Sequence, residues 1–286
     1  MNGFRYERPT TLAQATALLA AAAGKAKVLA GGTDLLVALR SGASRPELVV
    51  DIKRVEGLSE IRWTSAGDLV IGAAVEIRRI YEDPRIAAVF PALAQGAAAI
   101  GSLQIRNRAT VGGNLANASP CMDTAPPLLV LGASARVAGS AGERQVPLHG
   151  FFVDVKKTVL APDEVLIAVI VPAPPAGLRS AFDKIKRIYG HDLALVNAAA
   201  TFEPASRTLR AAVGSCGVTP ILLPPLTGIG KGPGPEEAGR RLAALALEHI
   251  CPIDDVRASA EYRRDMTALL CRRLAERLLE KGTGRG

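Results

Sequence analysis

The sequence predicts an α+β fold: a small N-terminal βα unit, then a mixed α/β unit, then a C-terminal unit of a sheet followed by helices. Three observations support this prediction. A short apolar strand leads into a glycine turn and a helix near the N-terminus, hairpins alternate with alanine-rich helices in the middle of the chain, and two amphipathic helices end it. The predicted domains are 1–57, 58–177 and 178–286, with a proline-rich stretch closing the second.

The first domain is predicted to contain two strands and two helices. Residues 11–24 combine the spacing of a capping box with apolar residues at helical intervals. The apolar residues 28–30 predict a strand that leads through a glycine turn into a helix over 34–40. Residues 48–52 predict a second buried strand. The glycine turn therefore joins a strand to a helix.

Hairpin and helix patterns define the other two domains. The second is predicted to contain, in order, a hairpin over 60–72, an alanine-rich helix over 91–100, a second glycine turn, an apolar helix over 124–131, a hairpin around 139–142 and a strand over 165–171. The third is predicted to contain strands over 194–202 and 209–213 and helices over 236–249 and 259–281. Residues 228–234 evoke a nucleotide loop but predict a linker, because Lys231 is not followed by Ser or Thr.

Composition excludes several classes of protein. The 286-residue chain is 49% hydrophobic, enough for folded cores, yet has no apolar run long enough to span a membrane. No signal peptide is readable at the N-terminus, so a cytoplasmic protein is expected. The net charge is +8, but the positive residues form no basic tract with interleaved aromatics. A basic surface that meets an acidic partner or keeps the protein soluble is favoured over nucleic-acid binding.

Two glycine pairs are the strongest functional signal in the chain. One lies in Ala30-Gly31-Gly32-Thr33-Asp34-Leu35, directly after Val28 and Leu29, and the other in Thr110-Val111-Gly112-Gly113-Asn114-Leu115. Because glycine has no Cβ, consecutive N–H groups can turn to one side and form an anion-binding concavity. The hydroxyl of Thr33 can donate to phosphate, whereas the negative Asp34 is expected to cap the next helix. Two such turns predict a grip on an extended dinucleotide.

The metal-binding residue types are scattered. The cysteines are Cys121, Cys216, Cys251 and Cys271, and the histidines are His149, His191 and His249. No C-x-x-C pair occurs and no histidines cluster, which argues against an iron–sulfur cluster or a zinc site in this chain. Any metal centres that work with it are therefore expected on other polypeptides. Cys121 is expected to be a small buried residue.

The glycine motifs and their neighbours resemble the FAD-binding medium subunit of molybdenum hydroxylases, the family that includes carbon monoxide dehydrogenase, aromatic acyl-CoA reductases and the flavin domain of xanthine dehydrogenase. The resemblance covers nearly the whole chain and is carried further by Phe4–Pro9, Gln104–Ala109, Ser119–Asp123 and Glu261–Arg264. It implies a two-part PCMH-type FAD-binding domain, a C-terminal docking domain and non-covalent FAD.

The resemblance also implies residue roles. Asp123 would bind the ribityl and ribose hydroxyls, although it could instead cap a helix. Lys184 would lie by the pyrimidine side of the flavin and stabilise its reduced anion, although a solvated lysine is the alternative. Ile100 and Leu166 would pack near the isoalloxazine and adenine, or belong to the ordinary core. The predicted cofactor-binding set is Val28, Leu29, Ala30, Gly31, Gly32, Thr33, Asp34, Leu35, Ile100, Thr110, Val111, Gly112, Gly113, Asn114, Asp123, Leu166 and Lys184, with no catalytic and no metal-binding residue.

The function implied by the resemblance is electron transfer through FAD. A large partner subunit would carry the molybdenum cofactor, a small one two 2Fe-2S clusters, and the three chains would double into an (αβγ)2 heterohexamer. Where relatives that reduce NAD carry an Arg-Arg pair, this chain has Ile188-Tyr189, so the match does not extend to nicotinamide binding. Two alternatives remain: a self-sufficient FAD-dependent oxidoreductase, and a non-enzymatic assembly or nucleic-acid-binding protein that retains the fold.

Overall fold

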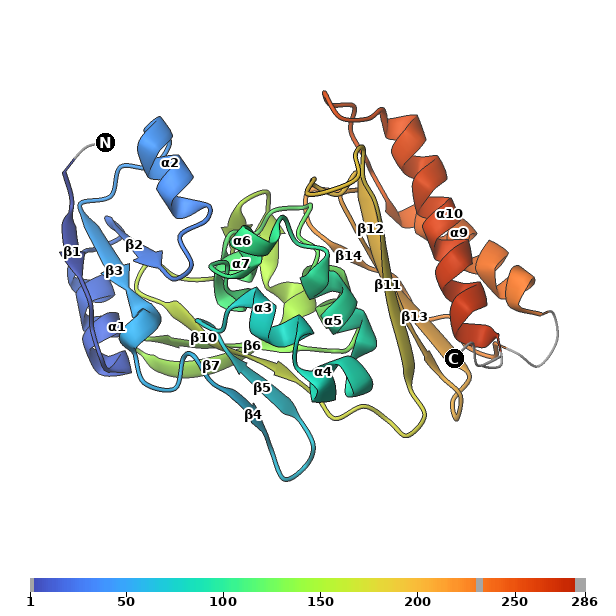
Figure 1. The fold of residues 1–286 in the computed structure, drawn as a ribbon, viewed down its shortest axis with the longest axis horizontal. Helices are drawn as coiled ribbons and strands as arrows, with labels where there is room; N and C mark the ends of the chain where they lie inside the picture. The colour runs from blue at the N-terminus through green and yellow to red at the C-terminus, as the bar shows by residue number, and fades with distance from the viewer. Residues whose placement is uncertain (1–2, 230–233, 281–286) are drawn as a thin grey trace. The chain divides into compact units, whose positions relative to one another are not determined.

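A computed structural model describes residues 3–229 and 234–280. They form two compact units, each built from segments that are distant in the sequence (Figure 1). Unit 1 holds the described residues of Met1–Arg79, Ser102–Ala118 and Gly132–Ala173, and unit 2 holds those of Ile80–Gly101, Ser119–Leu131 and Pro174–Gly286. Helices and strands occur in both units, which confirms the predicted α+β class.

Unit 1 begins with a parallel sheet of three strands in the order β1-β3-β2. Its elements are β1 (Arg5–Glu7), α1 (Leu12–Ala21), β2 (Ala26–Leu29), α2 (Leu35–Ser41), β3 (Leu48–Asp51) and the 3-10 turn η1 (Ile52–Arg54). The predicted capping box is present, because the N–H of Gln14 donates to the hydroxyl of Thr11 and the N–H of Thr11 donates to the carboxamide of Gln14. The predicted strand, glycine loop and helix therefore follow one another as β2, residues 30–34 and α2.

A second, antiparallel sheet completes unit 1, with the strand order β4-β5-β10-β6-β7. Its strands are β4 (Ile61–Trp63), β5 (Leu69–Gly72), β6 (Ser134–Gly139), β7 (Gly142–Pro147) and β10 (Val165–Val171), accompanied by α6 (Leu103–Arg106), α7 (Val111–Ala116), η2 (Leu148–Gly150) and the hairpin β8 (Phe152–Asp154) and β9 (Lys157–Thr158). Val165 and Ile167 of β10 share one buried cluster with Val50 of β3 and Leu19 of α1. The two sheets of unit 1 are thus joined by a common core.

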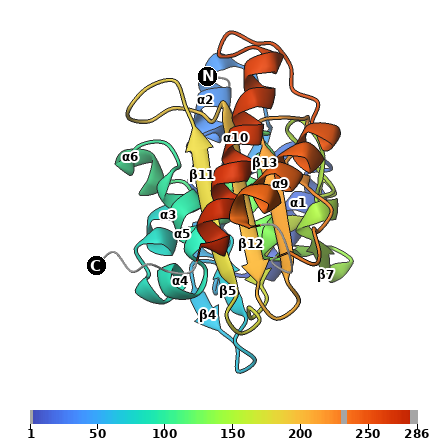
Figure 2. The ribbon, with the colours of Figure 1, turned by 90° about the vertical axis from the view of Figure 1, so that its right-hand side faces the viewer.

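Unit 2 is built around an antiparallel sheet in the order β11-β12-β13-β14. Its elements are β11 (Arg179–Ile185), β12 (Val196–Glu203), β13 (Thr208–Gly214), β14 (Ile221–Leu222), α4 (Pro84–Val89), α5 (Pro91–Ala98), α8 (Ala125–Val130), α9 (Pro235–His249) and α10 (Ala260–Leu279), while α3 (Ile77–Tyr81) crosses from the unit 1 segment into this one. Figure 2 shows α9 and α10 lying over the sheet.

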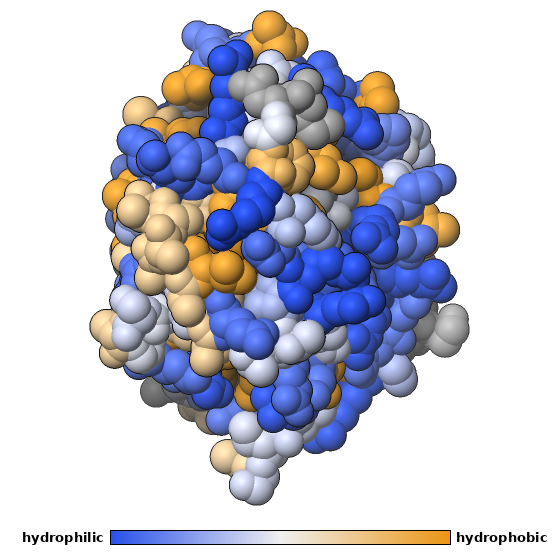
Figure 3. Space-filling model, turned by 90° about the vertical axis from the view of Figure 1, so that its left-hand side faces the viewer, coloured by the Kyte–Doolittle hydropathy of each residue, from blue (hydrophilic) through white to orange (hydrophobic). Residues whose placement is uncertain are grey.

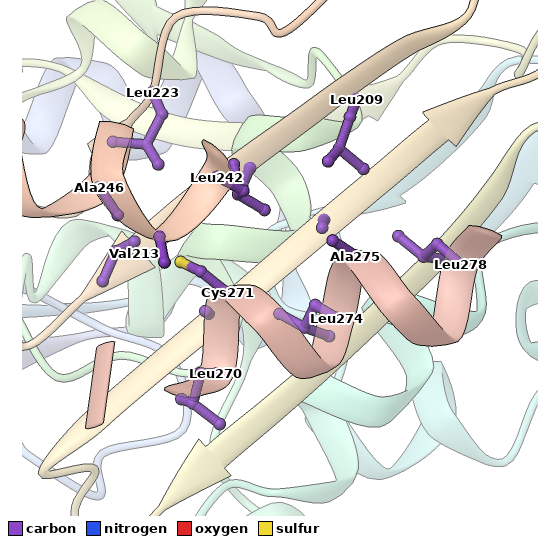
Figure 4. Packing of buried hydrophobic residues seen from close by; sticks show 14 of the residues in the cluster. Leu209, Val213, Leu223, Leu242, Ala246, Leu270, Cys271, Leu274, Ala275 and Leu278 are labelled. Atoms are coloured by element: carbon purple, nitrogen blue, oxygen red, sulfur yellow. The ribbon is translucent and has the colours of Figure 1, made fainter. Parts of the chain in front are cut away.

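The core of unit 2 lies between the sheet and the two long helices. Leu209 and Val213 of β13 face Leu242 of α9 and Leu270 and Leu274 of α10, all buried (Figure 4). Because side chains alternate along a strand, the opposite face of the sheet is free to meet α5 and α8. Strand β12 is consequently buried on both faces, which explains its run of alanines.

The structure departs from the predicted elements in several places. Residues 179–185, for which no element was predicted, form strand β11, and the second glycine pair lies inside helix α7 rather than in a turn. The predicted linker 228–234 and the last residue of the predicted helix 259–281 fall partly or wholly outside the described residues. None of the described helices has the length and apolarity needed to cross a membrane. The face in Figure 3 is mostly hydrophilic, with apolar residues in smaller groups.

Candidate functional site: a cavity between two glycine segments

A cavity of about 440 Å³ lies within unit 1, lined by both glycine segments. Residues 30–35, which run from the loop after β2 to the first residue of α2, form one part of the lining. Residues 112–114, near the start of α7, form another. Leu160, Val165 and Leu166 add an apolar wall. The volume falls within the roughly 300–1,000 Å³ of small-molecule sites. The fold therefore brings together two segments that are far apart in the sequence.

Two glycines allow the walls of this cavity to approach. A Cβ atom on Gly31 would lie 2.0 Å from the carbonyl oxygen of Arg108, just before α7. A Cβ atom on Gly112 would lie 2.5 Å from the Cβ of Ala73. Neither distance is compatible with a side chain, because the neighbouring atoms belong to backbone or to a short, inflexible residue. Gly31 and Gly112 are thus packing glycines.

The other two glycines have different roles. Gly32 has φ +77°, in the left-handed region that favours glycine. Gly113 has ordinary helical geometry and is exposed, and a Cβ atom there would meet only the Thr110 hydroxyl, at 3.0 Å. Gly113 is therefore the member of the second pair at which a side chain would enter open space beside the cavity.

The two glycine segments differ in the hydrogen-bond donors that they offer. Among the described residues, the backbone N–H groups of 32–35 meet no acceptor. In the second segment, by contrast, the N–H groups of 111–113 are used: Val111 donates to Val75, Gly112 to Ala73, and Gly113 to Thr110 Oγ1. The two segments therefore differ in their free donors, because Thr110 caps α7, and the grip of both segments on a dinucleotide stays a prediction. Within the described part of the chain, the first segment has the longer run of N–H groups without a backbone acceptor at the cavity.

A charged network anchors the first glycine segment. Lys53 Nζ donates to Asp51 Oδ1 at 2.7 Å and to the carbonyl oxygen of Ala30 at 3.2 Å, and the Tyr6 hydroxyl also donates to Asp51. Burial alone would raise the pKa of Asp51, but the hydrogen bonds from Lys53 and Tyr6 lower it, so the carboxylate stays charged. Tyr6 belongs to the family motif, but sequence analysis gave it no role and did not identify Asp51 or Lys53. An aspartate ending a buried strand was the available signal.

Most of the predicted cofactor-binding residues of unit 1 line this cavity. Val28, residues 30–35, Thr110, residues 112–114 and Leu166 do so, whereas Leu29 and Val111 do not. The expected cap at Asp34 is wrong: the side chain makes no capping hydrogen bond to α2, and its carboxylate lies 3.9 Å from Lys156 Nζ. Sequence analysis did not identify Lys156, which also lines the cavity.

The remaining predicted residues, Ile100, Asp123 and Lys184, belong to unit 2. Lys184 Nζ donates to Asp123 Oδ2 at 2.7 Å and to the carbonyl oxygen of Ala99 at 3.1 Å, and both charged side chains are only 6% exposed. Lys184 is therefore not a solvated lysine. Asp123 is not a helix cap either, since Thr124 holds that position before α8. Ile100 is buried.

Asn197 completes this buried cluster. Its Nδ2 donates to Asp123 Oδ1 at 2.7 Å and to the carbonyl oxygen of Met122 at 3.2 Å. Burial raises the pKa of Asp123, while the charge of Lys184 and the hydrogen bonds from Lys184 and Asn197 oppose that rise. Gly214 makes room for the amide, because a Cβ atom there would lie 2.1 Å from Asn197 Oδ1. An amide residue near the start of the mostly apolar strand β12 was the available sequence signal for Asn197.

The other residues singled out by sequence analysis are not among those that line the cavity. Tyr189, between β11 and β12, is fully exposed, and Cys121 is half-buried, not buried as expected, with its sulfur 3.7 Å from Arg257 Nη1. Burial raises the pKa of the Cys216 thiol to about 11 and that of Cys271 to about 12. Across residues 3–229 and 234–280, no group of three His, Cys, Asp or Glu side chains is placed to hold a metal ion.

Comparisons with known proteins agree with this geometry. The carbon monoxide dehydrogenase medium chain of Afipia carboxidovorans is 32% identical over 289 residues, covering 96% of each chain. A xanthine dehydrogenase FAD-binding subunit of Escherichia coli is 31% identical over 285 residues, covering 98% of this chain and 97% of the relative.

Solved structures give the same result. Reconstituted carbon monoxide dehydrogenase from Oligotropha carboxidovorans matches with a TM-score of 0.90 at 30% identity over 98% of this chain and 99% of that one. Quinoline 2-oxidoreductase from Pseudomonas putida 86 matches with a TM-score of 0.89 at 30% identity over 98% of both chains. The likeness therefore extends over both units.

Two family descriptions account for the chain. The FAD binding domain in molybdopterin dehydrogenase matches residues 2–174, and the CO dehydrogenase flavoprotein C-terminal domain matches residues 180–278. The resemblance seen in the sequence is thereby confirmed, and FAD is the cofactor of this domain. The chain belongs to the FAD-binding subunits of molybdopterin dehydrogenases and is an oxidoreductase subunit.

Proposed function

We propose that the chain is the FAD-carrying electron-transfer subunit of a molybdenum/iron–sulfur/flavin hydroxylase or dehydrogenase, in which electrons pass from partner iron–sulfur clusters to an external acceptor. The observation that carries this proposal is the cavity of unit 1, with backbone donors on one wall, in a chain that matches the FAD-binding family throughout. Bound FAD supplies an isoalloxazine ring that accepts and releases electrons.

The residues present fit this cofactor. The unpaired N–H groups of 32–35 suit an anionic diphosphate, and the apolar side chains of Leu160 and Leu166 suit a flat aromatic ring. In the family-based assignment, Asp123 accepts hydrogen bonds from sugar-like hydroxyls, Lys184 meets the pyrimidine side of the flavin, and Ile100 packs near its ring. The ion pair with Lys184 keeps Asp123 oriented, so these two residues act together. This chain's work is to bind and orient the cofactor, and the proposed function requires no acid–base catalysis by it.

The proposal extends to partners and organisation. A large molybdopterin subunit and a small subunit with 2Fe-2S clusters would complete an (αβγ)2 heterohexamer in the cytoplasm. Relatives named as a medium chain and as subunits of a dehydrogenase complex support the expectation of partners. We retain the division into domains 1–57, 58–177 and 178–286 as part of the proposal, with the last as the docking domain.

The test begins with the purified chain. It should be yellow, with one FAD per chain, and acid precipitation should release the chromophore because FAD is held without a covalent bond. Chromatography that shows FMN, or a folded preparation without flavin, would contradict the proposal. Two further subunits should co-purify from the source cell. The self-sufficient oxidoreductase predicts instead that an organic substrate bleaches the flavin of the isolated chain.

A further inference from the structure

One residue at the cavity has an unusual backbone conformation. Lys156 lies in the tight turn between β8 and β9 with φ +60°, the left-handed region that residues with a Cβ rarely adopt. Turn positions of this kind favour glycine, as at Gly142, the first residue of β7. The backbone conformation at this position would suit glycine better than lysine, so it does not explain why a lysine is found there. Conformations of this type gather at ligand-binding sites, so the contacts of this side chain are informative.

The contacts of Lys156 place that side chain across the cavity. Its backbone N–H donates to the carbonyl oxygen of Ala118 at 2.9 Å, which fixes the turn. Its Nζ donates to Asn117 Oδ1 at 2.9 Å and lies 3.9 Å from Asp34 Oδ1. Asn117 follows α7 and Asp34 follows the first glycine pair, so one ammonium group reaches both glycine segments. Lys156, Asp34 and Asn117 all line the cavity.

The negative charge of Asp34 explains why a cation is needed beside the first glycine segment. Asp34 places a negative charge beside the backbone donors of 32–35 and would repel a diphosphate bound to them. The other cavity-lining carboxylate, Glu164, is paired with Arg144 at 2.6 Å. The ammonium of Lys156 offsets Asp34, yet it remains half-exposed and able to move toward an entering anion.

We propose that Lys156 binds the diphosphate of the dinucleotide in this cavity, and that the side chain exchanges its contact with Asp34 for the phosphate oxygens when the ligand enters. The inference rests on the proposed function, because FAD supplies the diphosphate. It also identifies the ligand group that binds near Lys156 as a nucleoside diphosphate. The segments that hold Lys156 in place, 117–118 and 154–158, belong to unit 1 throughout.

The experiment measures binding by the full-length chain after removal of flavin. FAD, ADP and adenosine are titrated calorimetrically into wild type, Lys156→Met and Lys157→Met at low and high salt. The control Lys157 lies next in the same hairpin, is 70% exposed and pairs with Asp154, but does not line the cavity. Lys156→Met should weaken FAD and ADP roughly tenfold, leave adenosine unchanged and reduce the salt dependence. Lys157→Met should bind like wild type.

Two more variants separate binding from folding. Lys156→Gly suits the left-handed turn, so its melting temperature without ligand should equal or exceed that of wild type while its FAD affinity falls as in Lys156→Met. Lys156→Arg should recover part of the affinity. Equal FAD and ADP affinities in wild type and Lys156→Met, an equal loss for adenosine, or no ADP binding by wild type would overturn the inference alone. Failure of the wild-type chain to bind FAD would overturn the proposed function as well.

Discussion

A Cβ atom on Gly31 would lie 2.0 Å from the carbonyl oxygen of Arg108, so the two segments that line the cavity touch through backbone. The contact joins the loop after β2 to the residues before α7. This close backbone contact gives Gly31 a packing role in the fold of unit 1. That role differs from that of the neighbouring residue Gly32, which lines the cavity without such a contact. Packing residues and cavity-lining residues therefore lie next to one another within a single short segment.

The first prediction distinguishes packing glycines from cavity glycines. Gly31→Ala should lower the free energy of unfolding by at least roughly 1–3 kcal/mol, because backbone must shift to relieve the overlap with Arg108. Gly113→Ala should fold almost normally, since its Cβ meets only the Thr110 hydroxyl, but should weaken FAD binding at the exposed helix start. Urea denaturation and FAD titration of both variants measure the difference. Equal stability of the two variants would contradict it.

The second prediction concerns the buried pair of unit 2. Lys184→Met leaves the carboxylate of Asp123 without its ion-pair partner at 6% exposure, which should cost about 3–5 kcal/mol of unfolding free energy. The double variant Lys184→Met with Asp123→Asn should recover much of that loss, because no charge then remains buried. Denaturation of the single and double variants tests this. If the reconstituted holoprotein also shows a lower flavin potential for Lys184→Met, the family-based placement of Lys184 gains support.

The third prediction is the pH dependence of that loss. Burial raises the pKa of Asp123 from 3.8, so the folded chain keeps a proton there at pH values just above 3.8, where the unfolded chain has released it. Stability from this group therefore falls as pH rises through that window. Removing Lys184 strengthens the rise in pKa, so the stability gap between wild type and Lys184→Met should narrow as pH falls toward 4. If the stability difference between wild type and Lys184→Met did not change with pH, the loss of unfolding free energy would not come from the charge of Asp123.

Sequence reasoning succeeded where the signals were local. The capping box of Thr11 and Gln14, the helices α9 and α10 and the hairpin of β4 and β5 are each specified by neighbouring residues. Strand β11 was missed because charged residues interrupt its apolar alternation. Capping, periodicity and turn patterns each involve only a few neighbouring residues. They therefore predict helices and strands but not the contacts between them.

The long-range parts of the candidate site had no such signal. Lys184 and Asn197 face each other only through the register of β11 against β12, and Asp123 reaches them from the segment before α8. The family motif supplied Asp123 and Lys184 but not the contact between them. Lys156 and Lys53 are ordinary lysines in the sequence, and only the fold brings them to the glycine segment.

The fourth prediction concerns thiol reactivity. Cys251 is exposed, whereas Cys216 and Cys271 are buried and have pKa values raised to about 11 and about 12. Because the thiolate is the reactive form, the two buried residues should react with a disulfide reagent only after unfolding. Cys251 should react fastest in the native chain, and half-buried Cys121 more slowly. Mass spectrometry of labelled peptides identifies the sites, and native labelling of Cys271 would show that its core opens.

The last prediction concerns acid stability. Asp255 is held by Arg263, whose side chain is 2% exposed and whose Nη2 donates to Asp255 Oδ1 at 2.8 Å. Burial would raise the pKa of Asp255, but hydrogen bonds from the Arg257 backbone and guanidinium, the Ala258 N–H and Arg263 hold it well below 3.8.

A depressed folded-state pKa gives stability that is present above the unfolded value, near 3.8, and is lost as pH falls through the folded value. Wild type should therefore lose stability as pH falls below about 4. Asp255→Asn should be less stable than wild type at neutral pH, because a neutral amide binds Arg263 more weakly. It should also lose less stability on acidification. Unfolding free energies of both proteins between neutral pH and pH 3 measure the two slopes, and parallel slopes would assign the acid sensitivity to other carboxylates.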